Sequence, residues 1–150
     1  MNHESYIKKC IELAKKSETL KEIPVGALLI INNEIIFESH NSPINDKDPT
    51  SHAEINVIRR ACKKVNNYRL KNTTLYISLE PCIMCIGAIC EARIDRVIFG
   101  AYVDDEKKFN EKILFYKKNC NVDHIPEFKG GVLKNDCSLI IKNFFKRKRS

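Results

Sequence analysis

The chain has 150 residues, of which 43% are hydrophobic, a length and composition that fit one folded domain with one core. Its 26 Lys and Arg residues exceed its 19 Asp and Glu residues by 7, which favours a polyanionic partner such as nucleic acid, although a lysine-rich proteome would give the same surplus. The longest apolar run, residues 25–31, is too short to cross a bilayer, and the polar N-terminus lacks the apolar stretch of a signal peptide. We therefore expect a single domain over residues 1–150 that works in the cytoplasm without a membrane.

The first third of the chain predicts a helix, a hairpin and a loop. Apolar residues recur at helical spacing over residues 4–17, which indicates an amphipathic helix. Two short apolar runs, 25–31 and 35–37, are separated by a pair of asparagines. Because asparagine tolerates the positive φ of a tight turn, these runs predict a β-hairpin. Residues 40–49 are rich in Asn, Asp and Pro, a composition typical of a loop.

The middle of the chain predicts a strand, a helix and a second strand. A helix with one apolar face begins near Ser51, and residues 74–79 then read as a strand. Pro81 suits the first turn of the short helix that follows, and residues 96–101 form the next strand. A helix between two strands at this spacing is a βαβ unit, so we expect the two strands to be parallel.

The last third carries weaker signals. Apolar residues over 109–116 suggest a short helix, whereas residues 122–133 fit no single element. A final helix is indicated by the apolar face of residues 137–145, and it ends in a basic run over residues 146–149. No repeat or linker divides the chain. The elements together predict an α/β protein with a mixed sheet and helices on its faces.

Two short motifs carry candidate chemistry, and the first is the Cys82–Cys85 pair. The pair follows a strand and opens a helix, where unpaired backbone N–H groups and the helix dipole stabilise thiolates. Two thiolates at this spacing can bind one zinc ion. A closed structural zinc site would usually need a second pair of ligands, and the chain offers no second CxxC motif. A thioredoxin-like redox motif is the alternative for such a pair.

The second motif is His52-Ala53-Glu54 at the start of the preceding helix. His52 with the two cysteines would leave the fourth zinc position open, as in catalytic sites, where zinc lowers the pKa of water and supplies hydroxide. Glu54 is close enough to the histidine to move protons without binding the metal. Its alternative role is structural, because Ser51 and Glu54 have the spacing of a capping box. The combination of HxE with PCxxC favours the catalytic interpretation, and this signature is a known description of zinc nucleobase deaminases.

The chain resembles the bacterial tRNA adenosine deaminases over nearly its whole length. The resemblance is strongest in EIPVGALLI (22–30), HNSPINDKDPTSHAEI (40–55), NYRLKNTTLYISLEPCIMC (67–85) and RIDRVIFGA (93–101). It implies a three-layer α/β/α fold around a five-stranded mixed sheet, of the cytidine deaminase type. It also implies a homodimer that binds one zinc ion per chain through His52, Cys82 and Cys85, and that converts the wobble adenosine of a tRNA anticodon stem-loop to inosine with Glu54 as proton shuttle.

The resemblance also suggests substrate contacts. Asn41 and the backbone of Ala53 would contact the target base, and Phe144 and the basic run of residues 146–149 are candidates for RNA contact. Core packing is the alternative for Phe144, and a solvated surface is the alternative for the basic run. The family's glycine-rich loop is replaced here by the glycine-free residues 102–112, where one inserted residue lets Asp104 take the place of the family's aspartate.

Three functions remain open at this point. The first is tRNA adenosine deamination, and the second is deamination of a free base or nucleoside, of guanine or cytosine type, at the same metal site. The third is a redox protein or a structural-zinc protein that uses Cys82 and Cys85 without needing Glu54. The basic surplus and the Asn41 loop favour the first function.

Overall fold

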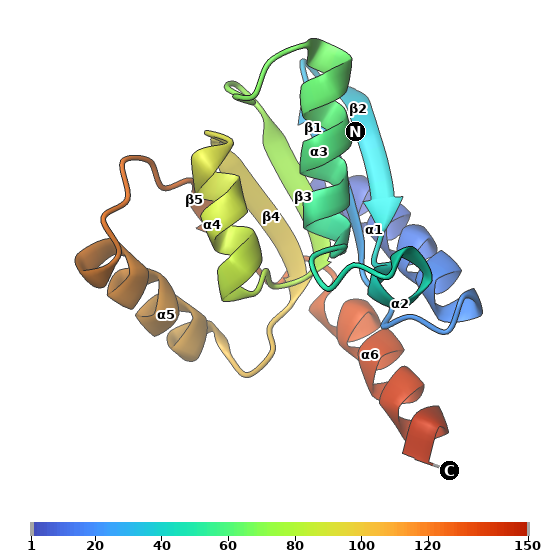
Figure 1. Ribbon diagram of the computed structural model, residues 1–150. Helices are drawn as coiled ribbons and strands as arrows, with labels where there is room; N and C mark the ends of the chain where they lie inside the picture. Colours follow the sequence, from blue (N-terminus) through green and yellow to red (C-terminus); the bar gives the residue numbers. More distant parts are fainter. Residues whose placement is uncertain (1, 150) are drawn as a thin grey trace.

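A computed structural model, which describes residues 2–149, shows a five-stranded mixed sheet between two layers of helices (Figure 1). The α/β/α fold expected from the sequence is confirmed. In chain order the elements are α1 (His3–Thr19), β1 (Gly26–Ile31), β2 (Glu34–His40), α2 (Pro43–Asp46), α3 (Ala53–Val65), β3 (Thr74–Leu79), α4 (Ile83–Glu91), β4 (Arg96–Ala101), α5 (Glu106–Asn119), β5 (Glu127–Lys129) and α6 (Lys134–Arg149).

The sheet has the strand order β2-β1-β3-β4-β5. β1 pairs antiparallel with both β2 and β3, whereas β3, β4 and β5 are parallel to one another. The predicted hairpin and the predicted βαβ unit are therefore both confirmed. Asn32 and Asn33 form the hairpin turn with φ values of 50° and 64°, as the choice of asparagine predicts.

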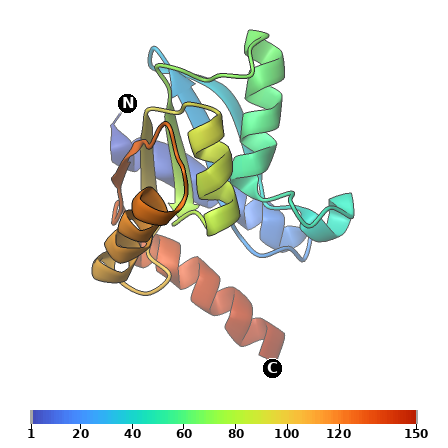
Figure 2. The ribbon, with the colours of Figure 1, turned by 60° about the vertical axis from the view of Figure 1, so that its left-hand side comes forward.

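Alternate residues of each strand face opposite helix layers, because side chains in a strand point to opposite faces of the sheet. In β1, Ala27 and Leu29 pack toward α3 and α4, and Leu28 and Ile30 pack toward α1 and α6. The views in Figures 1 and 2 show the sheet covered in this way on both faces. The inner strands β1, β3 and β4 are buried on both faces, so they read as continuous apolar runs in the sequence.

Three local predictions need correction. The loop over residues 40–49 contains the short helix α2, which begins with Pro43, and α4 begins only after Pro81, with Cys82 as its N-cap. The ambiguous stretch 122–133 contributes the edge strand β5, three residues long and parallel to β4. Such a short strand gives no periodicity in the sequence, so its pairing with β4 alone defines it. No helix within residues 2–149 is both long and apolar enough to span a membrane.

Helix α1 approaches the start of β1 so closely that only glycine fits at position 26. A Cβ atom there would overlap the backbone oxygen of Cys10 and lie 2.7 Å from the Cβ of Leu13 and 2.9 Å from the backbone nitrogen of Ala14. Since backbone atoms cannot rotate away, the helix and the strand would have to separate. This contact fixes α1 against the face of the sheet.

We therefore expect Gly26→Ala to lower the free energy of unfolding by about 1–3 kcal/mol, the usual cost of overpacking. Denaturant unfolding followed by circular dichroism measures it. Gly87→Ala is the matched control, because a Cβ there meets only the Tyr116 hydroxyl at 3.4 Å and alanine favours a helix. Equal stability of the Gly26 variant and the wild type would contradict the tight packing of α1 on β1.

Candidate metal centre and substrate cleft

Three metal-ligand side chains meet where helices α3 and α4 begin. His52 is the N-cap of α3, Cys82 is the N-cap of α4, and Cys85 lies in the first turn of α4. His52 Nδ1 lies 3.6 Å from Cys82 Sγ and 3.5 Å from Cys85 Sγ. The three donor atoms lie within 4.8 Å of one another. The fold thus brings together all three of the predicted ligands.

The spacing of these donors fits a zinc ion. Tetrahedral ligands at the usual Zn–S and Zn–N distances are about 3.6 Å apart from sulfur to nitrogen, and both observed separations agree with that value. One nitrogen and two sulfurs are also the donor types that zinc prefers. Three protein ligands leave one tetrahedral position for water or substrate, which is the arrangement of a catalytic site.

The pKa directions make Cys82 the anionic member of the cluster. Hydrogen bonds from Cys85 and His52 lower the pKa of the Cys82 thiol to about 3. The hydrogen bond to Cys82, together with burial, raises the pKa of Cys85, and the hydrogen bond to Cys82 raises the pKa of His52. The cluster therefore shares protons around a sulfur anion, and a divalent cation can replace those protons.

Glu54 lies at the second helical position of α3, next to this cluster, and only 4% of it is exposed. Burial raises the pKa of its carboxyl group, although hydrogen bonds from its own backbone and from Cys85 act to lower it.

Helix α3 begins at Ala53 with His52 as its N-cap, and this N-cap makes no side-chain capping bond. Ser51 is therefore not the N-cap, and the capping-box interpretation of Ser51 and Glu54 is wrong.

A cleft of about 510 Å³ opens above the three donors, within the size range of small-ligand sites. His52, Glu54 and Cys82 line it together with apolar walls. One wall comes from the start of β1 and the loop after β2, and the other comes from the segment between β4 and α5. The residues that complete the lining are Ile23, Val25, Asn41, Leu79, Glu80, Pro81, Ile83, Val103, Asp104, Lys108, Phe109 and Lys112.

Of the predicted substrate contacts, Asn41 and Asp104 line this cleft, and Ala53 and Phe144 do not. Asn41 is only 7% exposed, and its Nδ2 donates to the Ile23 backbone oxygen at 3.2 Å. Its Oδ1 has no hydrogen-bond partner within residues 2–149, so it can accept a bond from a ligand in the cleft. Phe144 is 7% exposed and packs edge-on against the Phe145 ring, which favours the core-packing alternative for Phe144.

The glycine-free segment that follows β4 is held to the cleft by Glu80, which sequence reasoning missed. Glu80 is buried, and its carboxylate accepts bonds from the Val103 backbone nitrogen at 2.6 Å and from Lys112 Nζ at 2.7 Å. Lys112 also donates to the Pro81 oxygen at 3.2 Å. Instead of a flexible loop, the segment thus forms α5, whose N-cap Asp105 accepts a bond from the Lys108 nitrogen at 2.8 Å.

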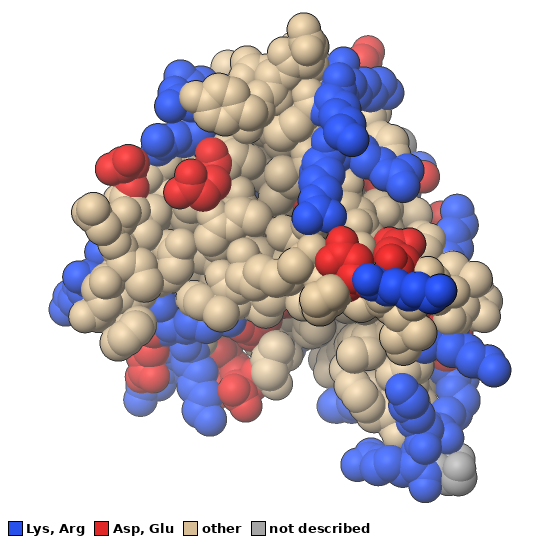
Figure 3. All heavy atoms as spheres, in the orientation of Figure 1, with Lys and Arg blue, Asp and Glu red and all other residues tan. Residues whose placement is uncertain are grey.

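Lys and Arg side chains gather over the free end of α6, which extends away from the sheet (Figure 3). Two members of this basic run make contacts within the chain. Arg147 pairs with Glu18 of α1, and Lys148 Nζ lies 5.4 Å from the centre of the Phe144 ring. The side chains of Lys146 and Arg149 are exposed. Part of the run therefore anchors the end of α6, and part of it faces solvent.

Comparison with known proteins identifies the family to which these metal-ligand residues belong. The family model for the cytidine and deoxycytidylate deaminase zinc-binding region matches residues 1–101, which include both motifs. The chain belongs to this deaminase family. A tRNA-specific adenosine deaminase of Buchnera aphidicola subsp. Baizongia pistaciae is 47% identical over 97% of this chain and 90% of its own length. That of Bacillus subtilis is 38% identical, with the same two coverages.

Solved structures agree with this assignment. A structure from a study of A-to-I editing by tRNA:A34 deaminases superimposes on this deaminase with a TM-score of 0.80. It is 31% identical and covers 91% of this chain and 98% of its own. A guanine deaminase from Bacillus subtilis is 33% identical with a TM-score of 0.68, covering 99% of this chain and 94% of its own. The fold and zinc-binding region are therefore common to deaminases with different substrates.

We expect His52→Ala to reduce zinc affinity of this deaminase by more than about 100-fold, because loss of a single hydrogen-bond partner of a ligand already costs 10–100-fold. Metal analysis of the purified protein, with a chelator competition, measures the affinity. His124→Ala is the control, because it removes a histidine outside the three donors. Unchanged zinc content in the His52 variant would remove His52 from the ligand set.

Glu22 fixes the loop that carries Asn41. Only 1% of Glu22 is exposed, and its carboxylate accepts bonds from the Ile44 nitrogen at 3.2 Å and from the Asn45 backbone and side-chain nitrogens, each at 2.8 Å. These donors include the unpaired N–H groups at the start of α2. Burial by itself would raise the pKa of Glu22, but the bonds from Asn45 and Ile44 outweigh it and the pKa lies below its usual value.

Because the folded-state pKa is depressed, the ionised carboxylate stabilises the fold above its unfolded-state pKa, and this stabilisation is lost as the pH falls through the folded-state value. We expect Glu22→Gln to cost about 1–3 kcal/mol of unfolding free energy at neutral pH. The difference from wild type should shrink as the pH falls below about 4. Urea unfolding at several pH values measures this, with Glu12→Gln, an exposed position on α1, as control. A difference that grows toward acid pH would refute it.

Proposed function

We propose that this deaminase converts adenosine to inosine at the wobble position of a tRNA anticodon. The observation that carries the proposal is the His52, Cys82 and Cys85 cluster beside a buried Glu54 on the floor of a cleft. The relatives at 38–47% identity over nearly the whole chain, which are tRNA-specific adenosine deaminases, support the choice of substrate.

The reaction replaces the exocyclic amine of adenine by an oxygen from water and releases ammonia. When bound, zinc supplies a Lewis acid that activates the water. Glu54 takes a proton from the water and delivers protons to the ring nitrogen and to the departing amine. Burial raises the pKa of this carboxyl group, which makes the carboxylate a stronger base and brings its pKa nearer to neutral pH, so that it can both accept and release a proton. His52, Cys82 and Cys85 hold the metal and take no part in proton transfer.

The walls of the cleft bind the base. Asn41 accepts a hydrogen bond through its free Oδ1, while Ile23 and Val25 contact the faces of the ring. Asp104 lies at the exposed rim beside Lys108, whose Nζ is 3.9 Å from its carboxylate. The extruded nucleotide enters from this rim, and the neighbouring phosphates lie near the cations of α5 and of the exposed part of α6.

The proposal includes the assembly and location of the enzyme. We infer that the whole chain forms one deaminase domain that works in the cytoplasm as a homodimer. Exposed apolar side chains next to the cleft, Ile83 and Val103, offer surface that a partner or an RNA base could cover. Sedimentation equilibrium of the zinc-loaded protein measures the mass of the assembly.

Glu54→Ala tests the mechanism. We expect this variant to keep its fold and its zinc, because Glu54 is not among the three donors, and to lose turnover by about 100- to 10,000-fold, the usual contribution of a general acid–base group. Inosine formation is followed in a tRNA anticodon stem-loop with adenosine at the wobble position. A redox or structural-zinc protein would not need Glu54. Wild-type rates of inosine formation in the variant would therefore contradict the mechanism.

The same assay separates the two substrate classes. Wild-type protein is offered the stem-loop beside free adenine, guanine, cytosine and their nucleosides. Inosine in the stem-loop alone supports the proposal. Turnover only of a free base or nucleoside would establish the second candidate, which the 33% identical guanine deaminase structure supports, and would leave the zinc chemistry unchanged.

A further inference from the structure

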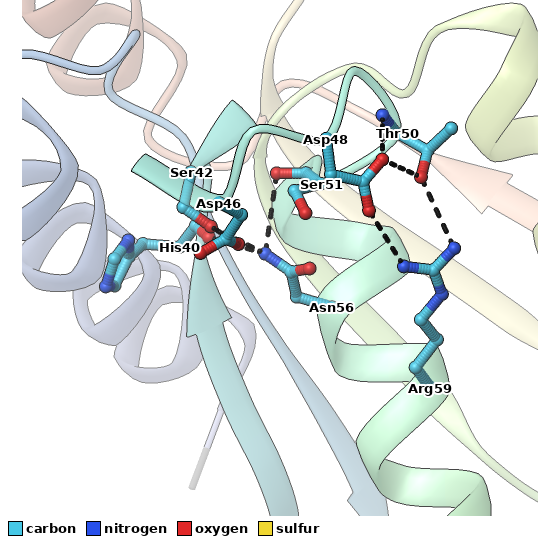
Figure 4. A network of polar contacts seen from close by, with 8 residues as sticks. All are labelled: His40, Ser42, Asp46, Asp48, Thr50, Ser51, Asn56 and Arg59. Atoms are coloured by element: carbon cyan, nitrogen blue, oxygen red, sulfur yellow. Dashed lines mark hydrogen bonds and ion pairs between the residues drawn. The ribbon is translucent and has the colours of Figure 1, made fainter. Parts of the chain in front are cut away.

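The loop between β2 and α3 connects Asn41 in the wall of the cleft to the metal-ligand residue His52. It begins with Asn41, which faces the cleft, and ends at Ser51, directly before the metal-ligand residue His52. The relative position of Asn41 and His52 therefore depends on how the ten residues between them are held. Figure 4 shows that the side chains that hold it come from α3 and from the loop itself.

One side chain of α3 contacts both ends of the loop. Asn56 Nδ2 donates to the His40 backbone oxygen and to Ser42 Oγ, each at 3.1 Å, and to the Ser51 backbone oxygen at 3.4 Å (Figure 4). Carbonyl oxygens only accept hydrogen bonds, so the amide nitrogen and not the amide oxygen must face them. His40 and Ser42 are the two neighbours of Asn41 in the chain.

The loop is closed at the same point by its own backbone. The Ser42 nitrogen donates to the Ser51 oxygen at 2.9 Å, and Ser42 Oγ donates to Asp46 Oδ2 at 2.6 Å. Asn56 thus lies at the junction where the chain enters and leaves the loop. Since Asn56 is on the helix that begins with His52, it links the position of Asn41 directly to the metal-binding end of α3.

A second contact between α3 and the loop lies further from the cleft. Arg59 NH1 donates to Asp48 Oδ2 at 3.2 Å, and Asp48 Oδ1 accepts bonds from the nitrogen and the hydroxyl of Thr50 at 2.8 and 2.7 Å. Arg59 is exposed, so its ion pair with Asp48 contributes little to stability. None of these three residues lines the cleft. Arg59 therefore provides a control on the same helix.

We propose that Asn56 is a positioning residue for deamination: its amide holds the residues on both sides of Asn41 at a fixed distance from the metal-binding end of α3. The inference rests on the proposed function, because it requires Asn41 to contact the target base. A polar donor with two hydrogens is needed, since a side chain without donors would remove the bonds to the His40 oxygen and Ser42 Oγ and would leave the Ser51 oxygen with the Ser42 nitrogen alone. The loop would then relax and Asn41 would move relative to the reacting atoms.

The test is a double-mutant cycle between Asn56→Leu and Asn41→Ala. Leucine is close to asparagine in size but has no donors. We expect Asn56→Leu to keep its zinc and to lose about 100-fold in kcat/KM on the tRNA stem-loop, the typical cost of a 1 Å misplacement. In the Asn41→Ala background the same change should cost less than a factor of three. Two controls should each stay within threefold of wild type: Asn121→Leu, the same change at an exposed position after α5 that does not line the cleft, and Arg59→Ala.

Amide hydrogen exchange gives a second readout that does not need activity. The Ser42 amide, which donates to Ser51, should exchange at least tenfold faster in Asn56→Leu than in wild type, while amides in α1 remain unchanged. If the leucine variant does not fold, Asn56→Ser replaces it in both experiments, because its short hydroxyl cannot span the same acceptors.

The outcomes separate this inference from the proposed function. Equal losses from Asn56→Leu in the presence and absence of Asn41 would show a general structural role and overturn the positioning role. Unchanged kcat/KM or unchanged exchange at Ser42 would overturn it as well. If wild-type protein deaminates only a free base, the proposed function fails, and the same cycle measured on that base still decides whether Asn56 acts through Asn41.

Discussion

The meeting of two helix N-termini is the constraint on which the rest of this structure depends. α3 and α4 both start at the same end of the sheet, so the N-cap residues His52 and Cys82 come within 3.6 Å of each other. Helix N-termini favour anionic ligands such as thiolates, and here two of them converge on one point. The parallel β3-α4-β4 unit and the packing of α3 on β1 and β2 place these starts together. A shift of either helix would separate the donors.

Buried carboxylates hold the two walls of the cleft. Glu22 holds the loop with α2 on one side, and Glu80 holds the segment that leads into α5 on the other. Each carboxylate accepts backbone N–H groups that would otherwise be unpaired, which is a common way to fix irregular backbone. The predicted substrate contacts Asn41 and Asp104 therefore lie on connecting segments that the scaffold positions.

The segment after β4 forms one of the two walls. The resemblance to the tRNA enzymes predicts a glycine-rich loop here, whereas the chain has charged and aromatic residues without glycine. These residues form α5, whose Phe109 packs against Phe99, Tyr102 and Phe128. A helix anchored by a ring cluster and by the Glu80–Lys112 pair gives the cleft a firm wall. Asp104 lines the cleft beside this wall.

The fold class, the strands β1 to β4 and the candidate metal ligands could all be predicted from the sequence. Buried strands and amphipathic helices leave periodic apolar patterns, and the HxE and PCxxC motifs are local, so His52, Glu54, Cys82 and Cys85 could be named before the fold was known. Features that depend on contacts between distant segments could be found only in the folded chain. The short strand β5, the buried Glu80 and the Asn56 bridge have no periodicity or motif of their own. Each is defined by a partner elsewhere in the chain, and local sequence patterns do not encode such pairings.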